Sequence, residues 1–111
     1  MFKSLVAAAG DELVFALVPA GGELSLKKLA ASAGTKQARM AEPRDAERVT
    51  GYQVGGISPL GSRRALRTFV DESATSLPAV LLNAGGRGSI AEVATDALIA
   101  HLDAVLAPLT R

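Results

Sequence analysis

Two apolar runs open the chain, at residues 2–7 and 12–19, with Gly10 and Asp11 between them. Runs of this length that are bounded by turn residues are typical of β-strands, so we expect two strands joined by a tight turn. The second run, ELVFALVP, is apolar at successive positions rather than at alternate ones. This pattern predicts a central strand that is buried on both faces.

Helical periodicity follows, from Ser25 to Gly34. The apolar residues that share one helical face are Leu26, Leu29, Ala30 and Ala33. A hydroxyl residue at the start and a glycine at the end are the usual caps of a helix. We therefore expect a short amphipathic helix whose two lysines, Lys27 and Lys28, point to water.

The rest of the pattern predicts short strands and two more helices. In chain order we expect a strand at 36–41, a helix at 43–49, an irregular loop at 51–61, strands at 66–70 and 78–83, a glycine-rich turn at 84–88 and a strand at 90–93. A last helix is expected because apolar residues then recur at roughly helical spacing; Thr95 would cap it and Pro108 would break its last turn. These apolar residues are Leu98, Leu102, Val105 and Leu109.

Strands outnumber helices in this prediction, and the two do not alternate regularly. The expected fold class is therefore α/β (α+β), with a mixed, partly barrel-like β-sheet flanked by short helices. At 111 residues the chain is long enough for one hydrophobic core and too short for two. We expect a single domain spanning 1–111, as a monomer or a small homo-oligomer.

Composition excludes several kinds of chemistry. The chain has no cysteine, which excludes disulfides, thiolate metal sites and a catalytic thiol. Its one histidine, His101, falls in the expected last helix, and its carboxylates show no ligand spacing, so we expect neither a metal site nor another cofactor. No stretch has the ~20 apolar residues needed to cross a bilayer. We expect no membrane partner and a cytoplasmic location.

Basic residues are unevenly distributed along the chain. The formal net charge is only +1, but residues 24–67 hold nine basic residues against three acids, a local net charge of +6. The basic residues are Lys27, Lys28, Lys36, Arg39, Arg44, Arg48, Arg63, Arg64 and Arg67. If they share one face, they would attract a polyanion; if they are scattered, they are ordinary solvated side chains.

The loop at 51–61 is the strongest candidate for a binding site. It contains four glycines and Pro59, too many for a helix or a regular strand. Consecutive glycines, Gly55 and Gly56, let a ligand approach the main chain, whose N–H groups together with the Ser58 hydroxyl could bind a carboxylate, a phosphate or an ester carbonyl. A tight turn or bulge without a ligand is the alternative. The pattern is neither a Walker loop nor a dinucleotide fingerprint.

Two cations outside this loop are further candidates. Lys3 lies within an apolar stretch, so it must either point to solvent or occupy a polar pocket. Arg87 lies between two glycines, where it is either a turn residue or an anion contact. No conventional catalytic set is visible, because a triad would have to be built on His101 alone.

These residues resemble the YbaK/EbsC/ProX-type aminoacyl-tRNA deacylases, which are related to the editing domain inserted in bacterial prolyl-tRNA synthetases. The resemblance runs through nearly the whole chain. Its matching segments are FKSLV at residues 2–6, the helix at 24–31, MAEP at 40–43, the long signature TGYQVGGISPLG at 50–61, and GGRG at 85–88. The long signature is highly specific.

The resemblance implies a mixed, partly barrel-like sheet and hydrolysis of the ester that joins a wrong amino acid to tRNA. The usual substrates are Cys-tRNA(Pro) and Ala-tRNA(Pro). The expected partners are therefore aminoacylated tRNA and prolyl-tRNA synthetase, and we do not expect binding to DNA. The matched substrate-binding residues are Gly55, Gly56, Ile57, Ser58, Pro59, Arg87 and Gly88. Lys3 matches the essential lysine of the family. A substrate group or a bound water is then expected to attack the ester.

Two departures from the family pattern are visible. Family members usually carry a further segment before the lysine, so we expect a misassigned start codon or a truncated chain that lacks this segment. Ile90 occupies a position where many relatives have a polar pocket residue, and it cannot form that hydrogen bond. The alternatives are a non-catalytic module that binds tRNA or aminoacyl-adenosine, an inactive truncated remnant, and a binder of small metabolites or free amino acids.

Overall fold

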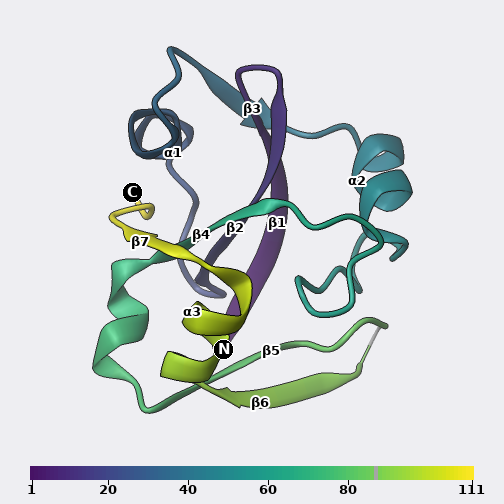
Figure 1. The fold of residues 1–111 in the computed structure, drawn as a ribbon, viewed down its shortest axis with the longest axis vertical. Helices are drawn as coiled ribbons and strands as arrows, with labels where there is room; N and C mark the ends of the chain where they lie inside the picture. Colours follow the sequence, from purple (N-terminus) through teal and green to yellow (C-terminus); the bar gives the residue numbers. More distant parts are fainter. Residues whose placement is uncertain (87) are drawn as a thin grey trace.

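The computed structural model describes residues 1–86 and 88–111, and its largest element is a five-stranded mixed sheet in the order β3-β1-β2-β4-β7 (Figure 1). Its strands are β1 (Phe2–Ala9), β2 (Glu12–Pro19), β3 (Ala38–Met40), β4 (Arg67–Asp71) and β7 (Val105–Ala107). β1 is antiparallel to both of its neighbours, whereas β2, β4 and β7 run parallel. The predicted mixed sheet is confirmed. Within the described residues it does not close toward a barrel, because β3 and β7 remain its two edges.

A separate antiparallel pair, β5 (Ala79–Asn83) and β6 (Ile90–Ala94), lies across one end of this sheet (Figure 1). The helices are α1 (Leu26–Ala33), α2 (Pro43–Thr50) and α3 (Thr95–Leu102), with a 3-10 turn, η1 (Glu72–Ser76), that the sequence pattern did not predict. α1 begins and ends as expected: the Ser25 hydroxyl accepts a hydrogen bond from the N–H of Lys28, and Gly34 follows in the left-handed conformation.

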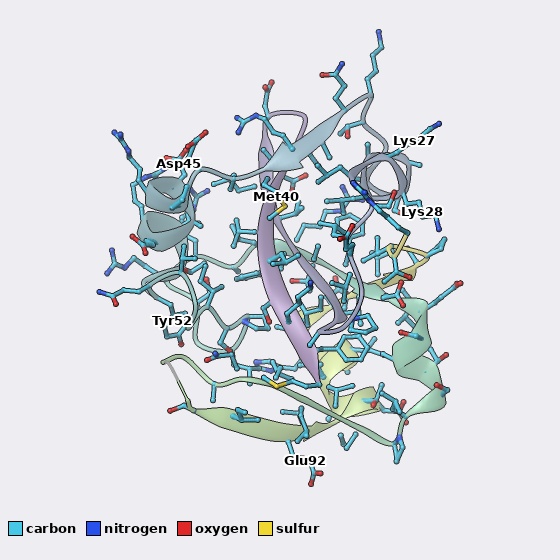
Figure 2. The ribbon with its side chains drawn as sticks, turned by 180° about the vertical axis from the view of Figure 1, so that it is seen from behind. Lys27, Lys28, Met40, Asp45, Tyr52 and Glu92 are labelled. Carbon is cyan, nitrogen blue, oxygen red and sulfur yellow. The ribbon has the colours of Figure 1, made fainter. Side chains whose placement is uncertain are left out.

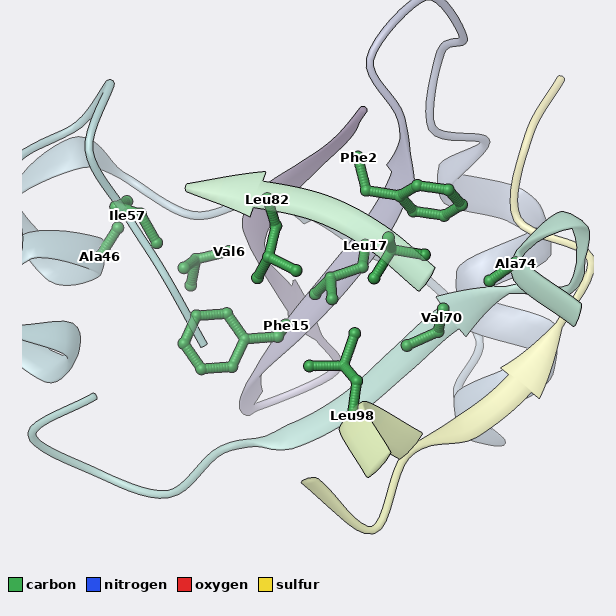
Figure 3. Packing of buried hydrophobic residues seen from close by; sticks show 11 residues of the cluster. Phe2, Val6, Phe15, Leu17, Ala46, Ile57, Val70, Ala74, Leu82 and Leu98 are labelled. Carbon is green, nitrogen blue, oxygen red and sulfur yellow. The ribbon is translucent and has the colours of Figure 1, made fainter. Parts of the chain in front are cut away.

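The hydrophobic core has two parts, one on each face of the sheet. Along β1 and β2, successive side chains point to opposite faces, so neighbouring apolar residues join different clusters. Figure 3 shows the packing of the first cluster, which includes Phe2, Val6, Phe15, Leu17, Ala46, Ile57, Leu82 and Leu98. The second includes Val14, Ala16, Val18, Leu24, Leu29 and Phe69. The prediction that 12–19 is buried on both faces is therefore confirmed.

The two helices that follow β2 lie on opposite faces of the sheet. Leu29 of α1 belongs to the second cluster, whereas Ala46 of α2 belongs to the first. In Figure 2, α1 with Lys27 and α2 with Asp45 accordingly appear on opposite sides of β1. Because the loop that leaves α2 includes Ile57 of the first cluster, this loop also lies away from α1.

The predicted C-terminal helix is wrong beyond Leu102. Asp103 adopts a left-handed conformation (φ 49°), and its N–H bonds back to the carbonyls of α3, which ends the helix. The next apolar residues form β7, which pairs with β4. Thr95 also differs from the prediction: it is the first residue of the helix, and its hydroxyl donates to the carbonyl of Leu77 at 2.7 Å instead of capping α3.

Candidate functional site

A cavity of about 500 Å³ runs along the free edge of β1. β3 pairs only with Ala7–Ala9, so the first half of β1 has no strand on this side among the described residues. Side chains of a strand alternate between faces, yet all of the residues 1–6 line the cavity. The cavity therefore follows the edge of the strand rather than one face of the sheet.

Four other segments complete the cavity wall. The residues beyond β1 are Met40, Ala41, Pro43, Ala46, Val54, Gly55, Ile57 and Asn83. They come from the end of β3, from α2, from the glycine loop and from the end of β5. Among the lining residues described by the structure, Lys3 is the one with an ionisable side chain. The volume and the mainly apolar wall are typical of a small-molecule site.

The glycine loop, defined as residues 51–61, is fastened to α2. Gly51 ends α2 in the left-handed conformation (φ 81°). Glu47, on α2, accepts a hydrogen bond through its Oε2 from the N–H of Val54 at 2.9 Å, and the Tyr52 hydroxyl donates to the carbonyl of Leu60 at 2.7 Å. The predicted irregular loop is confirmed, and side chains within and beside it fix its shape.

The glycine loop touches the second glycine-rich turn at Gly56 and Gly86. The N–H of Gly86 donates to the carbonyl of Gly56 at 3.1 Å. A Cβ on Gly56 would lie 3.0 Å from the backbone of Gly86, and one on Gly85 would lie 2.5 Å from the Tyr52 ring. A side chain at Gly56 would therefore push the Gly86 backbone away, and one at Gly85 would displace the Tyr52 ring, so glycine suits the close approach at both positions.

Three of the predicted site residues line the cavity: Lys3, Gly55 and Ile57. Lys3 is partly buried, and no ion pair of the described residues includes it, so its ammonium group is available to an anion. Gly55 and Ile57 line the same cavity from the glycine loop. The structure thus brings together residues that are separated by about half of the chain.

The other predicted residues lie behind or beside this wall. Gly56 and Pro59 are buried, and Ser58 is fully buried, with its Oγ accepting from the N–H of Leu60 at 3.1 Å. Gly88 is exposed, and Arg87 lies outside the described residues. Ile90 is 54% exposed at the start of β6.

Sequence reasoning missed Asn83, which lines the cavity and contacts both glycine-rich segments. Its Nδ2 donates to the carbonyl of Gly55, while its Oδ1 accepts from Gly85 and Gly86. An asparagine that immediately precedes a glycine-rich turn is a recognisable signal, because such side chains bond the backbone two residues ahead. The bond to Gly55, 28 positions away in the sequence, carries no local signal.

The basic residues of the segment 24–67 do not share one face. Lys27 and Lys28 lie on α1, across the sheet from Tyr52 (Figure 2), and Lys28 Nζ donates to the carbonyl of Thr110 at 2.6 Å. Arg48 and Arg64 border a different hollow, which Asp11 and Glu12 also line. For the lysines of α1, the structure therefore favours ordinary solvated side chains.

The remaining chemistry of the described chain is sparse. His101 is exposed and borders a hollow of about 230 Å³ together with Pro59 and Arg64. No group of three or more potential metal ligands occurs among the residues that the structure describes. Within the same residues, no helix is both long and apolar enough to span a membrane.

Comparison with known proteins places the chain in a family. The model of the aminoacyl-tRNA editing domain matches residues 1–100, so the chain belongs to this family of editing domains. This membership confirms the family and the class of enzyme that the resemblance predicted, a hydrolase of aminoacyl-tRNA that serves translation fidelity.

Two relatives illustrate the similarity. The chain is 37% identical over 112 residues to the Enterococcus faecalis protein "Putative Cys-tRNA(Pro)/Cys-tRNA(Cys) deacylase EbsC", with 99% of this chain and 68% of the relative covered. It superimposes on the crystal structure of "a putative trans-editing enzyme for prolyl tRNA synthetase" with a TM-score of 0.88 at 29% identity, covering 99% of this chain and 69% of that one. The expected fold is confirmed by this match.

Proposed function

We propose that the cavity binds the 3′-terminal adenosine and aminoacyl group of a mischarged tRNA, and that the protein hydrolyses the ester in trans. One observation carries this proposal. Lys3 and the glycine loop both match the family pattern but lie far apart in the sequence, and the structure brings them to the same cavity. A volume of about 500 Å³ is in the range that holds a ligand of nucleoside size. The name of the Enterococcus faecalis relative, a putative deacylase of Cys-tRNA(Pro) and Cys-tRNA(Cys), points to Cys-tRNA(Pro) as the substrate, and the family resemblance adds Ala-tRNA(Pro).

The groups around the cavity suit positioning better than proton transfer. The Lys3 ammonium provides a charge for the phosphate or ribose at the tRNA end. The N–H groups of Gly55 and Ile57 donate to no described backbone group, and in this proposal they polarise the ester carbonyl. Fixed donors that are already oriented toward the ester can supply several kcal/mol of catalysis without a side chain that exchanges a proton.

The attacking group then comes from the substrate or from water. Among the described cavity residues, no carboxylate or histidine is present to act as a general base. A cysteine thiol, a ribose hydroxyl or a bound water is therefore the nucleophile in this proposal, and the protein orients the ester toward it.

A deacylation assay tests the proposal. Purified protein is incubated with Cys-tRNA(Pro), Ala-tRNA(Pro) and correctly charged Pro-tRNA(Pro), and loss of the ester is followed over time. Lys3→Ala should slow hydrolysis ~10- to 100-fold, since a charged hydrogen bond contributes ~1.5–3 kcal/mol. Lys27→Ala, on α1 and across the sheet from the glycine loop, is the matched control and should hydrolyse at the wild-type rate. Equal rates for Lys3→Ala and Lys27→Ala would contradict the role of Lys3.

A non-catalytic module that binds tRNA is the second candidate, favoured by the same lack of a general base around the cavity. It predicts tRNA binding that weakens steeply as salt rises, without loss of the ester. The assay above separates the two, because turnover of any mischarged tRNA excludes this candidate.

A further inference from the structure

Hydrogen bonding along β1 alternates between its two edges. In an antiparallel pair, each residue directs its N–H and its C=O to the same side, and successive residues direct theirs to opposite sides. The Met1 carbonyl accepts from the N–H of Ala20, at 2.8 Å, so the odd-numbered residues face β2. The Val6 carbonyl accepts from the N–H of Ala41, at 3.1 Å, so the even-numbered residues face the side of β3.

Phe2 and Ser4 therefore direct their backbone groups to the edge that β3 leaves uncovered. β3 pairs with Ala7–Ala9 and reaches no further toward the start of β1. No described backbone group bonds the N–H or C=O of Ser4, and the cavity passes along this edge. An uncovered strand edge of this kind is a template for any ligand that presents a matching donor and acceptor.

Ser4 has a third unpartnered polar group. Its Oγ is buried and has no hydrogen-bond partner among the described residues. A buried hydroxyl without a partner is costly, ~1–3 kcal/mol, and such groups call for a ligand or water. Ser4 thus has an unpaired backbone donor and an unpaired backbone acceptor at the cavity wall, beside a hydroxyl that is buried.

We propose that the backbone of Ser4 binds the aminoacyl group of the substrate through the two hydrogen bonds that paired residues of antiparallel strands exchange. The Ser4 N–H donates to the ester carbonyl, and the α-amino group donates to the Ser4 carbonyl. A single amino acid ester carries the donor and the acceptor of one strand residue, so it can exchange both bonds. This inference rests on the proposed function and specifies how the amino acid, rather than the adenosine, is recognised.

The lining residues limit which groups can accept a hydrogen bond from the α-amine. An amine is bound in proteins either by a carboxylate or by neutral carbonyl oxygens. None of the described lining residues is an Asp or a Glu, so carbonyls are the acceptors at hand. Pairing at a strand edge also fixes the direction of the ligand side chain, since inverting the α-carbon would turn that side chain to the other face of the sheet. We therefore expect selectivity for an α-amine and for the L configuration.

Binding of three non-hydrolysable probes tests the inference. The probes are adenosine carrying L-alanine, D-alanine or propionate through a 3′-amide, and calorimetry measures the dissociation constant of each. The propionyl probe, which lacks only the α-amine, should bind about tenfold more weakly than the L-alanyl probe, because one hydrogen bond is lost. The D-alanyl probe should also bind more weakly. Equal binding of L-alanyl and propionyl probes would overturn the inference.

Variants of Ser4 separate the backbone from the side chain. Ser4→Pro removes an N–H that faces the free edge, where proline is tolerated, whereas Leu5→Pro removes an N–H that faces β2 and should unfold the protein. Folded Ser4→Pro should bind all three probes about tenfold more weakly, and wild-type affinity would count against the proposal. If Ser4→Pro does not fold, the probe comparison in the wild type decides.

Ser4→Ala keeps the backbone edge and should retain the preference for the L-alanyl over the propionyl probe. Loss of that preference would assign recognition to the hydroxyl instead of the edge.

Failure of the proposed function would be seen in a different measurement. If no mischarged tRNA is hydrolysed, the function falls and this inference falls with it. If hydrolysis occurs but the amine is irrelevant to binding, only the inference is lost.

Discussion

Asn83 joins the two glycine-rich segments of the site: its Nδ2 donates to the Gly55 carbonyl at 3.2 Å, and its Oδ1 accepts from the N–H of Gly85 at 3.1 Å. The same oxygen accepts from Gly86 at 3.3 Å. One amide side chain therefore uses its donor on the glycine loop and its acceptor on the neighbouring turn. The position of Gly55 in the cavity wall depends on a residue of β5.

Replacing Asn83 tests this link. Asn83→Asp keeps an acceptor for Gly85 and Gly86 but turns the donor that meets Gly55 into a second acceptor, so we expect repulsion at the glycine loop and a fall in deacylation of ~10-fold or more. The free energy of unfolding should fall by only ~1 kcal/mol. Stopped-assay kinetics and urea unfolding measure the two effects. A variant with wild-type kinetics would show that Asn83 does not position Gly55.

Gly56→Ala should displace the glycine loop without straining its own backbone. The new Cβ would lie 3.0 Å from the Gly86 backbone, which cannot move aside as a flexible side chain can. We expect a loss of stability of ~1–3 kcal/mol, as for other overpacked positions, together with loss of deacylation. Gly21→Ala is the matched control, because a Cβ there meets nothing within 4 Å. Comparable behaviour of the two variants would refute the close contact between the turns.

Tyr52 supports the same region through its hydroxyl and its ring. Tyr52→Phe keeps the ring against Gly85 and removes the bond to the Leu60 carbonyl. We expect a loss of ~1 kcal/mol in the free energy of unfolding and a smaller loss of activity than for Gly56→Ala. Tyr52→Ala, which also removes the ring, should lower both further. Chemical unfolding and deacylation rates of the two variants separate the hydrogen bond from the packing.

Local patterns accounted for much of the fold and for part of the site. The buried central strand, the cap residues of α1 and the irregular glycine loop are all set by neighbours in sequence, and each was predictable. The segment Val105–Ala107 was not, because helix and strand patterns coincide over so few residues and its pairing with β4 decides the outcome. The link from Asn83 to Gly55 and the uncovered edge of β1 depend on which strands become neighbours, which no local pattern encodes.

Asp71 supplies a prediction that involves stability alone. This buried carboxylate at the end of β4 accepts hydrogen bonds from the N–H groups of Leu109 at 2.9 Å, Thr110 at 3.2 Å and Ser73 at 3.2 Å. Burial by itself would raise its pKa, but the hydrogen bonds from Ser73, Leu109 and Thr110 together lower the pKa below the usual 3.8. The charged carboxylate thus fastens the C-terminal segment to the sheet.

A pKa that is lower in the folded state than in the unfolded state stabilises the protein wherever the carboxylate is ionised. The contribution is complete at pH values above the unfolded pKa of about 3.9 and is lost as the pH falls through the folded value.

Asp71→Asn should therefore lower the free energy of unfolding by ~2 kcal/mol at pH 7, and the difference from wild type should shrink in acid below about pH 4. Urea unfolding at pH 7, 5, 4 and 3 measures it, with the exposed Asp11→Asn as a control that changes stability by less than ~0.5 kcal/mol. A difference between Asp71→Asn and wild type that stays constant down to pH 3 would mean that the charge of Asp71 does not hold the C-terminal segment.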